Sequence, residues 1–358
     1  TRQQAARADG RYLGLGLSVI NERTGYGTPA YAARTMEITP GYERVEIAMT
    51  PSGDVEARVG VSPHGQGLRT TLSQIIAEEL GVDVGRIRII HGDTDRTPYG
   101  WGTFASRSLV IAGGASKIAA GQLAARLRQA AAVLLQSTPD RIMLRDGHAV
   151  VTDTQASVPL DTIARTVYHR AGPLSEQIGY DLNEAAVYDP VGTFSNACHV
   201  ACVEVDTETG GVRVDRYIVV EDAGRLINPM IVDGQVRGGV AQGIGNALYE
   251  EIVYAEDGNI LTSSFLDYLP PTAAQIPPIE VHHLMTLTDA SVTEAKGVGE
   301  GGAIGAPAAI VNAICDALAP FGVEINEMPA TPERVRALIR QREHDKRGEH
   351  DKRRGGAA

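Results

Sequence analysis

The chain is poor in cysteine and in aromatic residues. It has three cysteines, one tryptophan and four phenylalanines among 358 residues. Three cysteines are too few for a disulfide framework, which excludes the class of small disulfide-stabilised domains. Cys198 and Cys202 lie in an alternating segment that predicts a strand, and residues four apart on a strand are about 13 Å apart. They therefore cannot bind one metal ion or an iron–sulfur cluster together, and we expect all three cysteines to pack in the core.

Histidine clusters and phosphate-loop motifs are also missing. His282 and His283 are adjacent and would face opposite sides of a strand. His64 is the one histidine near a candidate functional loop. No G-x-x-x-x-G-K-[ST] motif occurs, which argues against a nucleotide-binding module of that class. Any iron–sulfur or flavin site is therefore expected on another chain.

Positive charge is in deficit. The chain has 44 acidic and 33 basic residues, a formal net charge of −11. This balance argues against nucleic-acid binding and favours solubility. No uninterrupted run of apolar residues approaches the ~18 residues of a membrane span. We expect no membrane span and a cytoplasmic location, and the length is sufficient for two domains.

Glycine, by contrast, is abundant, with 40 residues gathered partly in four turns that each precede a helix-like segment. These segments are 62–82, 92–108, 233–251 and 293–305. Gln66 and Glu300 each stand between two glycines, so a ligand can come close to the backbone there. The first turn of a helix offers free N–H groups that favour an anion. Four such turns predict a large polyanionic cofactor held by backbone N–H groups.

The order of elements is repeated. The first unit has expected strands near 44–50, 54–61 and 86–91 and helices near 68–80 and 106–136. The second has expected strands near 198–206 and 212–220 and, after a Gln242 turn, a helix to about 251. The pattern predicts an α+β protein in which two related α/β-type domains with mixed sheets enclose the cofactor.

Five segments carry a family resemblance. They are G-Q-G at 65–67, A-S-R-S at 105–108, D-A-G-R-L-I-N-P at 222–229, G-Q-V-R-G-G-V-A-Q-G at 234–243 and K-G-V-G-E at 296–300. In order and approximate spacing, the chain resembles the molybdenum-binding large subunit of the xanthine oxidase family, the molybdenum hydroxylases. The resemblance spans about residues 10–340 and covers the C-terminal half of that subunit.

The resemblance implies a division of labour between chains. The family's upstream G-G-F-G-type loop is absent from this sequence, so we expect a split, processed or excerpted large subunit whose active site another polypeptide completes. The expected parts are 1–40, packing on that upstream partner; 41–190, the first cofactor-binding unit; 191–340, the second unit with the catalytic Glu; and 341–358, a charged tail. Further expected partners are an iron–sulfur subunit with [2Fe-2S] and a flavin subunit with FAD.

The resemblance also assigns the site. It implies a molybdopterin cofactor, in the cytosine dinucleotide form, whose dithiolene holds the molybdenum without protein ligands. Glu300 matches the catalytic base, Gln66 matches the residue that hydrogen-bonds the metal's apical oxo ligand, and Ala105 lies beside the metal. The cofactor-binding residues implied are Gly65, Gln66, Gly67, Gly102, Thr103, Ala105, Ser106, Arg107, Ser108, Gln242, Lys296, Gly297, Val298 and Gly299. Lys296 to Gly299 would bring backbone N–H groups to the cofactor.

The activity implied is hydroxylation of an N-heterocyclic, purine-like or aldehyde substrate, with water as the oxygen source and electrons passing to the iron–sulfur and flavin partners. One alternative is carbon monoxide oxidation, which requires a copper-bearing cysteine in the upstream half. The other is a non-catalytic subunit that braces the cofactor, against which Glu300 and Gln66 argue. The chemistry of a base favours a partly buried carboxylate at Glu300.

Several of these residues also have a purely structural interpretation. Gln66 can cap the helix that follows it, and Ser106 and Ser108 can cap the Ala-rich helix. Arg107 can be a solvated charge. Asp222 and Asn228 have side chains that shape turns.

The C-terminus departs from the family. Residues 331–340 predict a last helix with Thr331 as its cap. The block E-H-D-K-R then occurs twice before residue 354. Such low-complexity charge predicts disorder.

Overall fold

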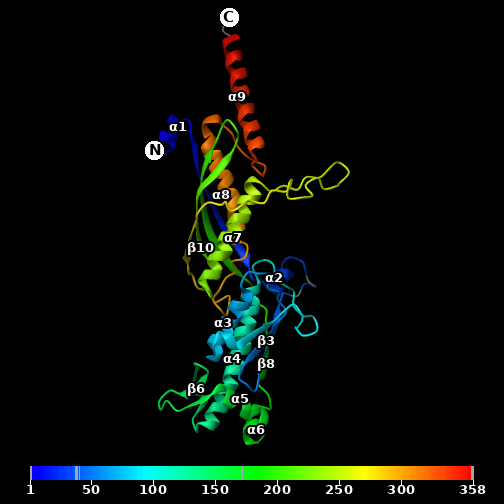
Figure 1. The fold of residues 1–358 in the computed structure, drawn as a ribbon, viewed down its shortest axis with the longest axis vertical. Helices are drawn as coiled ribbons and strands as arrows, with labels where there is room; N and C mark the ends of the chain where they lie inside the picture. The colour runs from blue at the N-terminus through cyan, green and yellow to red at the C-terminus, as the bar shows by residue number, and fades with distance from the viewer. Residues whose placement is uncertain (1, 37–38, 40, 171, 356–358) are drawn as a thin grey trace.

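The computed structural model describes residues 2–36, 39, 41–170 and 172–355. Figure 1 shows an elongated molecule in which two halves, each built from a sheet and helices, follow one another along the long axis. The helices are α1 (Arg2–Ala8), α2 (Thr28–Ala32), α3 (Leu68–Leu80), α4 (Ser108–Leu134), α5 (Leu160–His169), α6 (Pro173–Ile178), α7 (Pro229–Leu248), α8 (Gly301–Leu318) and α9 (Pro332–Gly355). The strands are β1 (Tyr12–Thr24), β2 (Glu43–Met49), β3 (Val55–Val59), β4 (Ile87–Ile90), β5 (Ile142–Arg145), β6 (His148–Val151), β7 (Ser157–Pro159), β8 (Asn183–Tyr188), β9 (Thr193–Val205), β10 (Val212–Asp222) and β11 (Ile279–Leu284).

The two main sheets have the same plan. One has the order β4-β3-β2-β8 and the other β11-β10-β9-β1. In each, an antiparallel hairpin is followed by a helix and then by a strand parallel to the second hairpin strand. The chain therefore runs β2-β3-α3-β4-α4 in the first unit and β9-β10-α7-β11-α8 in the second. The repeated order predicted from the sequence is confirmed, and the fold is α+β with mixed sheets.

In each main sheet, the fourth strand lies outside the consecutive run of strands that forms the rest of the sheet. β1 precedes the first unit but pairs with β9, and β8 directly precedes β9 but pairs with β2. The two units are therefore joined by an exchange of leading strands. The smaller sheet β5-β6-β7 and helices α5 and α6 lie at the far end of the first unit (Figure 1).

Each main sheet has its own helices and its own core. α4 packs on β2 and β8, while α8 packs on β1, β9 and α7. Two separate clusters of buried apolar residues fill these layers. In the second unit, α8 lies very close to the sheet. A Cβ at Gly16 of β1 would lie 2.0 Å from the carbonyl oxygen of Ala309 in this helix. Glycine is required there to admit the helix backbone.

The segment Gly301–Phe321 corrects one expectation, because it is long and apolar enough to cross a membrane by length and composition. Pro307, Asn312 and Asp316 interrupt its apolar residues, so the sequence shows no long uninterrupted apolar run there. The helix lies between sheet and α7, and half of its most apolar stretch is buried. A helix that is apolar all round is typical of a core position, so this segment is no evidence for a membrane.

Two local predictions are wrong. Residues 233–248 belong to α7, so Gln242 lies inside a helix and not in a Gly-rich turn. Asn228 starts this helix instead, since its Oδ1 accepts a hydrogen bond from the N–H of Ile231.

The tail continues α9 to Gly355 and was predicted to be disordered. Glu, Lys and Arg are good helix formers, so a charged repeat behind a capped helix can extend it.

Candidate functional site

A cavity of about 370 Å³ lies between the two units. Its wall contains residues at or near the start of four helices, namely Leu68 of α3, Ser108 of α4, Ile231 of α7 and Glu300 before α8. Helix starts carry unpaired N–H groups and a partial positive charge, and both favour an anion. The four helices that the sequence predicts behind Gly-rich segments thus meet at one place.

Three segments converge at the floor of this cavity, where Ser106 and Gly297 line it and Glu22, Thr24 and Ala105 lie behind them. The end of β1 contributes Thr24, whose Oγ1 accepts a hydrogen bond from the N–H of Gly297 at 3.0 Å. Ala105 and Ser106 have φ values of 48° and 50°, left-handed conformations that cost energy in non-glycine residues. A Cβ at Gly297 would lie 2.2 Å from the carbonyl oxygen of Ser106. The glycine therefore lets the 105–106 turn press against the loop that carries Glu300.

Ser106 connects two carboxylates at this floor. Its Oγ accepts a hydrogen bond from the N–H of Glu300 at 3.1 Å. The same Oγ donates to Oε1 of Glu22, on β1, at 2.9 Å. Glu300 itself is exposed in this chain, so the expected partial burial is wrong for the chain alone. Ser106 does not cap α4 with its side chain, since the N-cap residue is Arg107.

Arg107 is fully buried and is not a solvated charge. Its Nη1 donates to Oε1 of Glu43 at 2.6 Å and to the carbonyl oxygen of Gly102 at 2.7 Å, and its Nη2 donates to the carbonyl of Gly41. Both side chains of the ion pair have 0% exposure. Burial raises the pKa of Glu43, and the contact with Arg107 opposes this rise. The guanidinium thus fastens the 100–108 loop through its two terminal nitrogens.

Ser108 and Thr103 belong to the same loop and line the cavity. Ser108 Oγ donates to Thr103 Oγ1 at 2.8 Å, and Thr103 Oγ1 donates to the carbonyl of Ser62 at 2.9 Å. The two hydroxyls therefore tie the loop to the segment before Gln66. Gly102 has a φ of 100° and closes the turn before them.

Lys296 and Gly297 already use their backbone N–H groups. Lys296 N donates to the carbonyl of Ala223, and Gly297 N donates to Thr24. The Lys296 side chain is buried beside Asp222, with Nζ 3.1 Å from Oδ1. The prediction that both N–H groups face the cofactor is therefore wrong, because buried amides find partners within the protein. Val298 and Gly299 also line the cavity.

Gln66 lines the cavity without capping a helix. Its Oε1 accepts a hydrogen bond from the N–H of His64 at 2.8 Å, and the N-cap of α3 is Gly67. Gly65 and Gly67 have φ values of 102° and 81°, so both turn the backbone where a side chain would be strained. Because Oε1 accepts from His64, the Nε2 amide group is the part of the Gln66 side chain that can donate to a ligand.

The cavity includes one glutamine that the sequence assignment missed. Gln235 of α7 lines it, whereas Gln242 is exposed farther along the helix and does not. Seven residues place the two about 10 Å apart along a helix. The signal was present, because Gln235 stands about two turns past the Asn228 cap, on the helix segment that the cap directs into the cavity. Glu22 was also missed, since its strand was not recognised.

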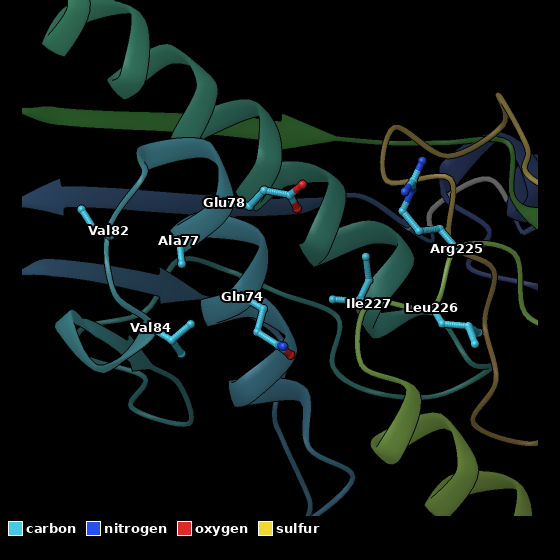
Figure 2. Close-up of a pocket in the computed structure, with 8 residues that line it drawn as sticks. All are labelled: Gln74, Ala77, Glu78, Val82, Val84, Arg225, Leu226 and Ile227. Atoms are coloured by element: carbon cyan, nitrogen blue, oxygen red, sulfur yellow. The ribbon is translucent and has the colours of Figure 1, made fainter. Parts of the chain in front are cut away.

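A second cavity, of about 460 Å³, adjoins the first. Figure 2 shows Gln74, Ala77 and Glu78 of α3 on one side of it, and Arg225 to Ile227, the segment that leads into α7, on the other. Arg225 and Ile227 line both cavities. Nδ2 of Asn228 donates to Gln74 Oε1 at 3.0 Å, so α3 also braces the start of α7. None of the residues predicted to bind the cofactor lies in this second cavity.

Among the residues that the structure describes, no group of three or more His, Cys, Asp or Glu is placed to hold a metal ion. The features that do point to a ligand are the helix starts and the Gly-rich floor. They suit an anionic group that brings its own metal ligands. This is the chemistry of a pterin dithiolene with a phosphate.

Comparisons with known proteins agree with this geometry. The profile of the molybdopterin cofactor-binding domain matches residues 1–277. The large subunit of nicotine 6-hydroxylase from Paenarthrobacter nicotinovorans is 40% identical over 338 residues, 93% of this chain and 41% of the relative. The carbon monoxide dehydrogenase large chain of Hydrogenophaga pseudoflava is 34% identical, over 93% of this chain and 42% of the relative.

A solved structure, quinoline 2-oxidoreductase from Pseudomonas putida 86, superposes with a TM-score of 0.88 and 39% identity. The match covers 95% of this chain and 43% of that chain. The chain thus spans about two fifths of the length of the proteins it matches. The match to the cofactor-binding profile, together with the cavity at four helix starts, shows that this chain belongs to the molybdopterin cofactor-binding domain family of xanthine oxidase-type large subunits.

Proposed function

We propose that this chain is the catalytic half of the molybdenum subunit of a hydroxylase that acts on an aromatic N-heterocycle, with Glu300 as the general base. One observation carries the proposal. Among the described residues, Glu300 is the one carboxylate on the wall of a cavity that is otherwise built to attract an anion. A carboxylate in this place weakens the binding of an anion, so a catalytic role explains its presence best.

The cavity suits the pterin cofactor. The N–H groups of Val298 and Gly299 and the amide groups of Gln66 and Gln235 offer donors to it. Lys296 is neutralised by Asp222, Arg107 by Glu43 and Arg225 by Glu294, so the local positive potential comes from helix starts. When bound, the cofactor supplies a molybdenum centre that accepts two electrons from the substrate. Glu300 would accept the proton of the water that supplies the oxygen.

The substrate class follows from the relatives. The names of two of them, a nicotine hydroxylase and a quinoline oxidoreductase, specify aromatic N-heterocycles. Carbon monoxide oxidation remains the second candidate, because a carbon monoxide dehydrogenase chain is 34% identical. Copper analysis of the whole complex separates the two, since the proposed hydroxylase needs no copper.

The rest of the large subunit would cover apolar surface that this chain leaves open. On the outer face of β1, Leu15, Leu17 and Val19 are 57%, 54% and 71% exposed. The long segment 249–278, which extends away from the body in Figure 1, exposes Phe265 and Leu266. Exposed apolar patches of this kind mark interaction sites. We expect the upstream chain there, with the iron–sulfur and FAD subunits beyond it and the complex in the cytoplasm.

The dinucleotide form of the cofactor is also part of the proposal. The loop 92–108 borders the cavity through Thr103 and Phe104. It exposes Tyr99 and Trp101, whose side chains are suited to stack on a nucleobase. Release of cytidine monophosphate from the purified complex by acid would support this form. Release of no nucleotide would limit the cofactor to the pterin monophosphate.

The decisive variant is Glu300→Gln in the intact complex. The amide keeps the shape of the side chain but removes the base, so turnover of an N-heterocycle should fall about 10²–10⁴-fold. Molybdenum and pterin content should equal those of the wild type. Glu208→Gln, in the exposed turn between β9 and β10, is the matched control and should change neither. Turnover of Glu300→Gln within about threefold of wild type would refute the base assignment.

A further inference from the structure

Glu22 is a carboxylate that the proposed chemistry leaves unexplained. It lies on the inward face of β1, where its register partner on β9 is Ser195. Its Oε1 accepts the Ser106 hydrogen bond, while its Oε2 is buried and has no hydrogen-bond partner among the described residues. A Cβ at Gly301 would lie 3.8 Å from this Oε2, so the oxygen lies against the first residue of α8, next to Glu300.

Ser106 offers no second donor to this oxygen. The single hydroxyl proton of Ser106 is already donated to Oε1, because Ser106 Oγ accepts from the N–H of Glu300. A buried carboxylate oxygen without a donor costs free energy, and a second carboxylate beside it adds repulsion. One proton held between the two carboxyl groups removes both costs, since each group then shares a single hydrogen bond.

We propose that Glu22 and Glu300 share one proton, and that Glu22 is the positioning residue that holds the base in place. The role of Glu300 as base rests on the proposed function, whereas the shared proton rests on the geometry of this chain. In the resting pair Glu22 carries the proton and donates it to the Glu300 carboxylate. When Glu300 accepts a proton from water, the pair holds two, and one then leaves to solvent.

The charged groups around the pair leave the proton with Glu22. His199 of β9 is the titratable group on the same inward face, and burial lowers its pKa to about 4, so it is neutral. Lys296 is engaged with Asp222, and Arg23 of β1 donates to the carbonyl of Val191. No described cation therefore neutralises the pair. Burial, opposed by the Ser106 hydrogen bond and reinforced by contact with Glu300, raises the pKa of Glu22 to about 7.

The shared proton can be measured without turnover. Infrared titration of the intact complex follows the carbonyl stretch of protonated carboxylic acids. The wild type should show a band that disappears as the pH rises through about 7. The band should be absent from Glu22→Gln and should persist in Glu46→Gln, a control on β2 away from the cavity. Absence of such a band in the wild type, or its persistence in Glu22→Gln, would overturn the proposal.

The kinetics of Glu22 variants then distinguish a residue that positions Glu300 from one that only stabilises the fold. Glu22→Leu removes the donor to Glu300 and should lower kcat about tenfold, the effect of one hydrogen bond, with KM and molybdenum content unchanged. Glu22→Gln keeps an N–H donor and should recover part of this loss. The wild-type rate should change as Glu22 loses its proton near pH 7, and the rate of Glu22→Gln should not. In a Glu300→Gln background, Glu22→Leu should cause no further loss. A further tenfold loss there, or loss of cofactor in Glu22→Leu alone, would show a merely structural residue.

These results distinguish the two proposals. If Glu300→Gln retains activity but the infrared band behaves as expected, the base assignment fails and the shared proton stands. If Glu300→Gln is inactive and no band titrates, the base stands and the shared proton fails.

Discussion

Arg107 and Glu300 occupy equivalent positions in the two units. Each is the N-cap residue of the helix that follows the unit's third strand, α4 and α8 respectively. Arg107 has a side-chain exposure of 0% and is paired with Glu43, whereas Glu300 is exposed and faces the cavity. The same backbone position thus carries opposite charges with opposite environments.

The difference shows how a repeated architecture can divide its tasks. In the first unit the N-cap side chain turns inward and fastens the loop 100–108 through two carbonyl groups. In the second unit, Ser106 and Thr24 fasten the loop through its backbone N–H groups, and the side chain of Glu300 faces the cavity. One unit therefore stabilises the floor and the other supplies the reactive group.

Loss of the buried ion pair in the first unit should have the largest effect on stability. Arg107→Met leaves Glu43 buried without its cation, and removal of one partner of a buried pair costs about 3–5 kcal/mol. We expect a large fall in the midpoint of thermal unfolding, and loss of cofactor because the loop is released. The double variant Arg107→Met with Glu43→Met removes both charges and should recover most of the stability. Equal instability of the single and double variants would contradict a role based on the ion pair.

A smaller loss of stability is expected where a methyl group is added between a helix and its sheet, and it should differ between the two units. In the second unit a Cβ at Gly16 of β1 would lie 2.0 Å from a backbone oxygen of α8, which cannot move aside. In the first unit a Cβ at Gly114 of α4 would lie 2.4 Å from the ring of Tyr188 on β8, which can rotate. Gly16→Ala should therefore destabilise the protein more than Gly114→Ala, by about 1–3 kcal/mol.

Gly121 of α4 provides the control for helix propensity. Its nearest neighbour is a flexible carboxylate oxygen of Glu79 at 3.9 Å, so Gly121→Ala should raise stability by about 0.5–1 kcal/mol. Urea unfolding of the three variants checks the order. A Gly16→Ala variant as stable as the wild type would show that α8 does not approach β1 as closely as described.

The sequence predicted the turns and helices around the site better than the strand that completes it. Polar residues between glycines marked the loops of Gln66 and Glu300, because glycine and helix starts leave a local signal. β1 left no such signal. Its inward positions include Gly14 and Gly16, while Leu15 and Leu17 face outward. The usual apolar-inward alternation is thus reversed, and Glu22 on this strand was not recognised as part of the site.

The remaining differences have similar local causes. Arg107 is buried because its carboxylate partner, Glu43, is 64 residues away in sequence, and such a pairing exists only in the tertiary structure. The family resemblance assigned Gln242 to the cofactor, but the Asn228 cap starts α7 earlier and directs Gln235 to the cavity. Long-range partners and cap positions therefore set the limits of what the sequence alone could predict.

The most direct test is to locate the molybdenum. Crystals of the intact complex, measured with anomalous scattering at the molybdenum edge, should give one peak per copy of this chain. That peak should lie in the cavity where α3, α4, α7 and α8 begin, beside Glu300 and the turn of Ala105 and Ser106. A peak in the second cavity, or outside both units, would contradict it.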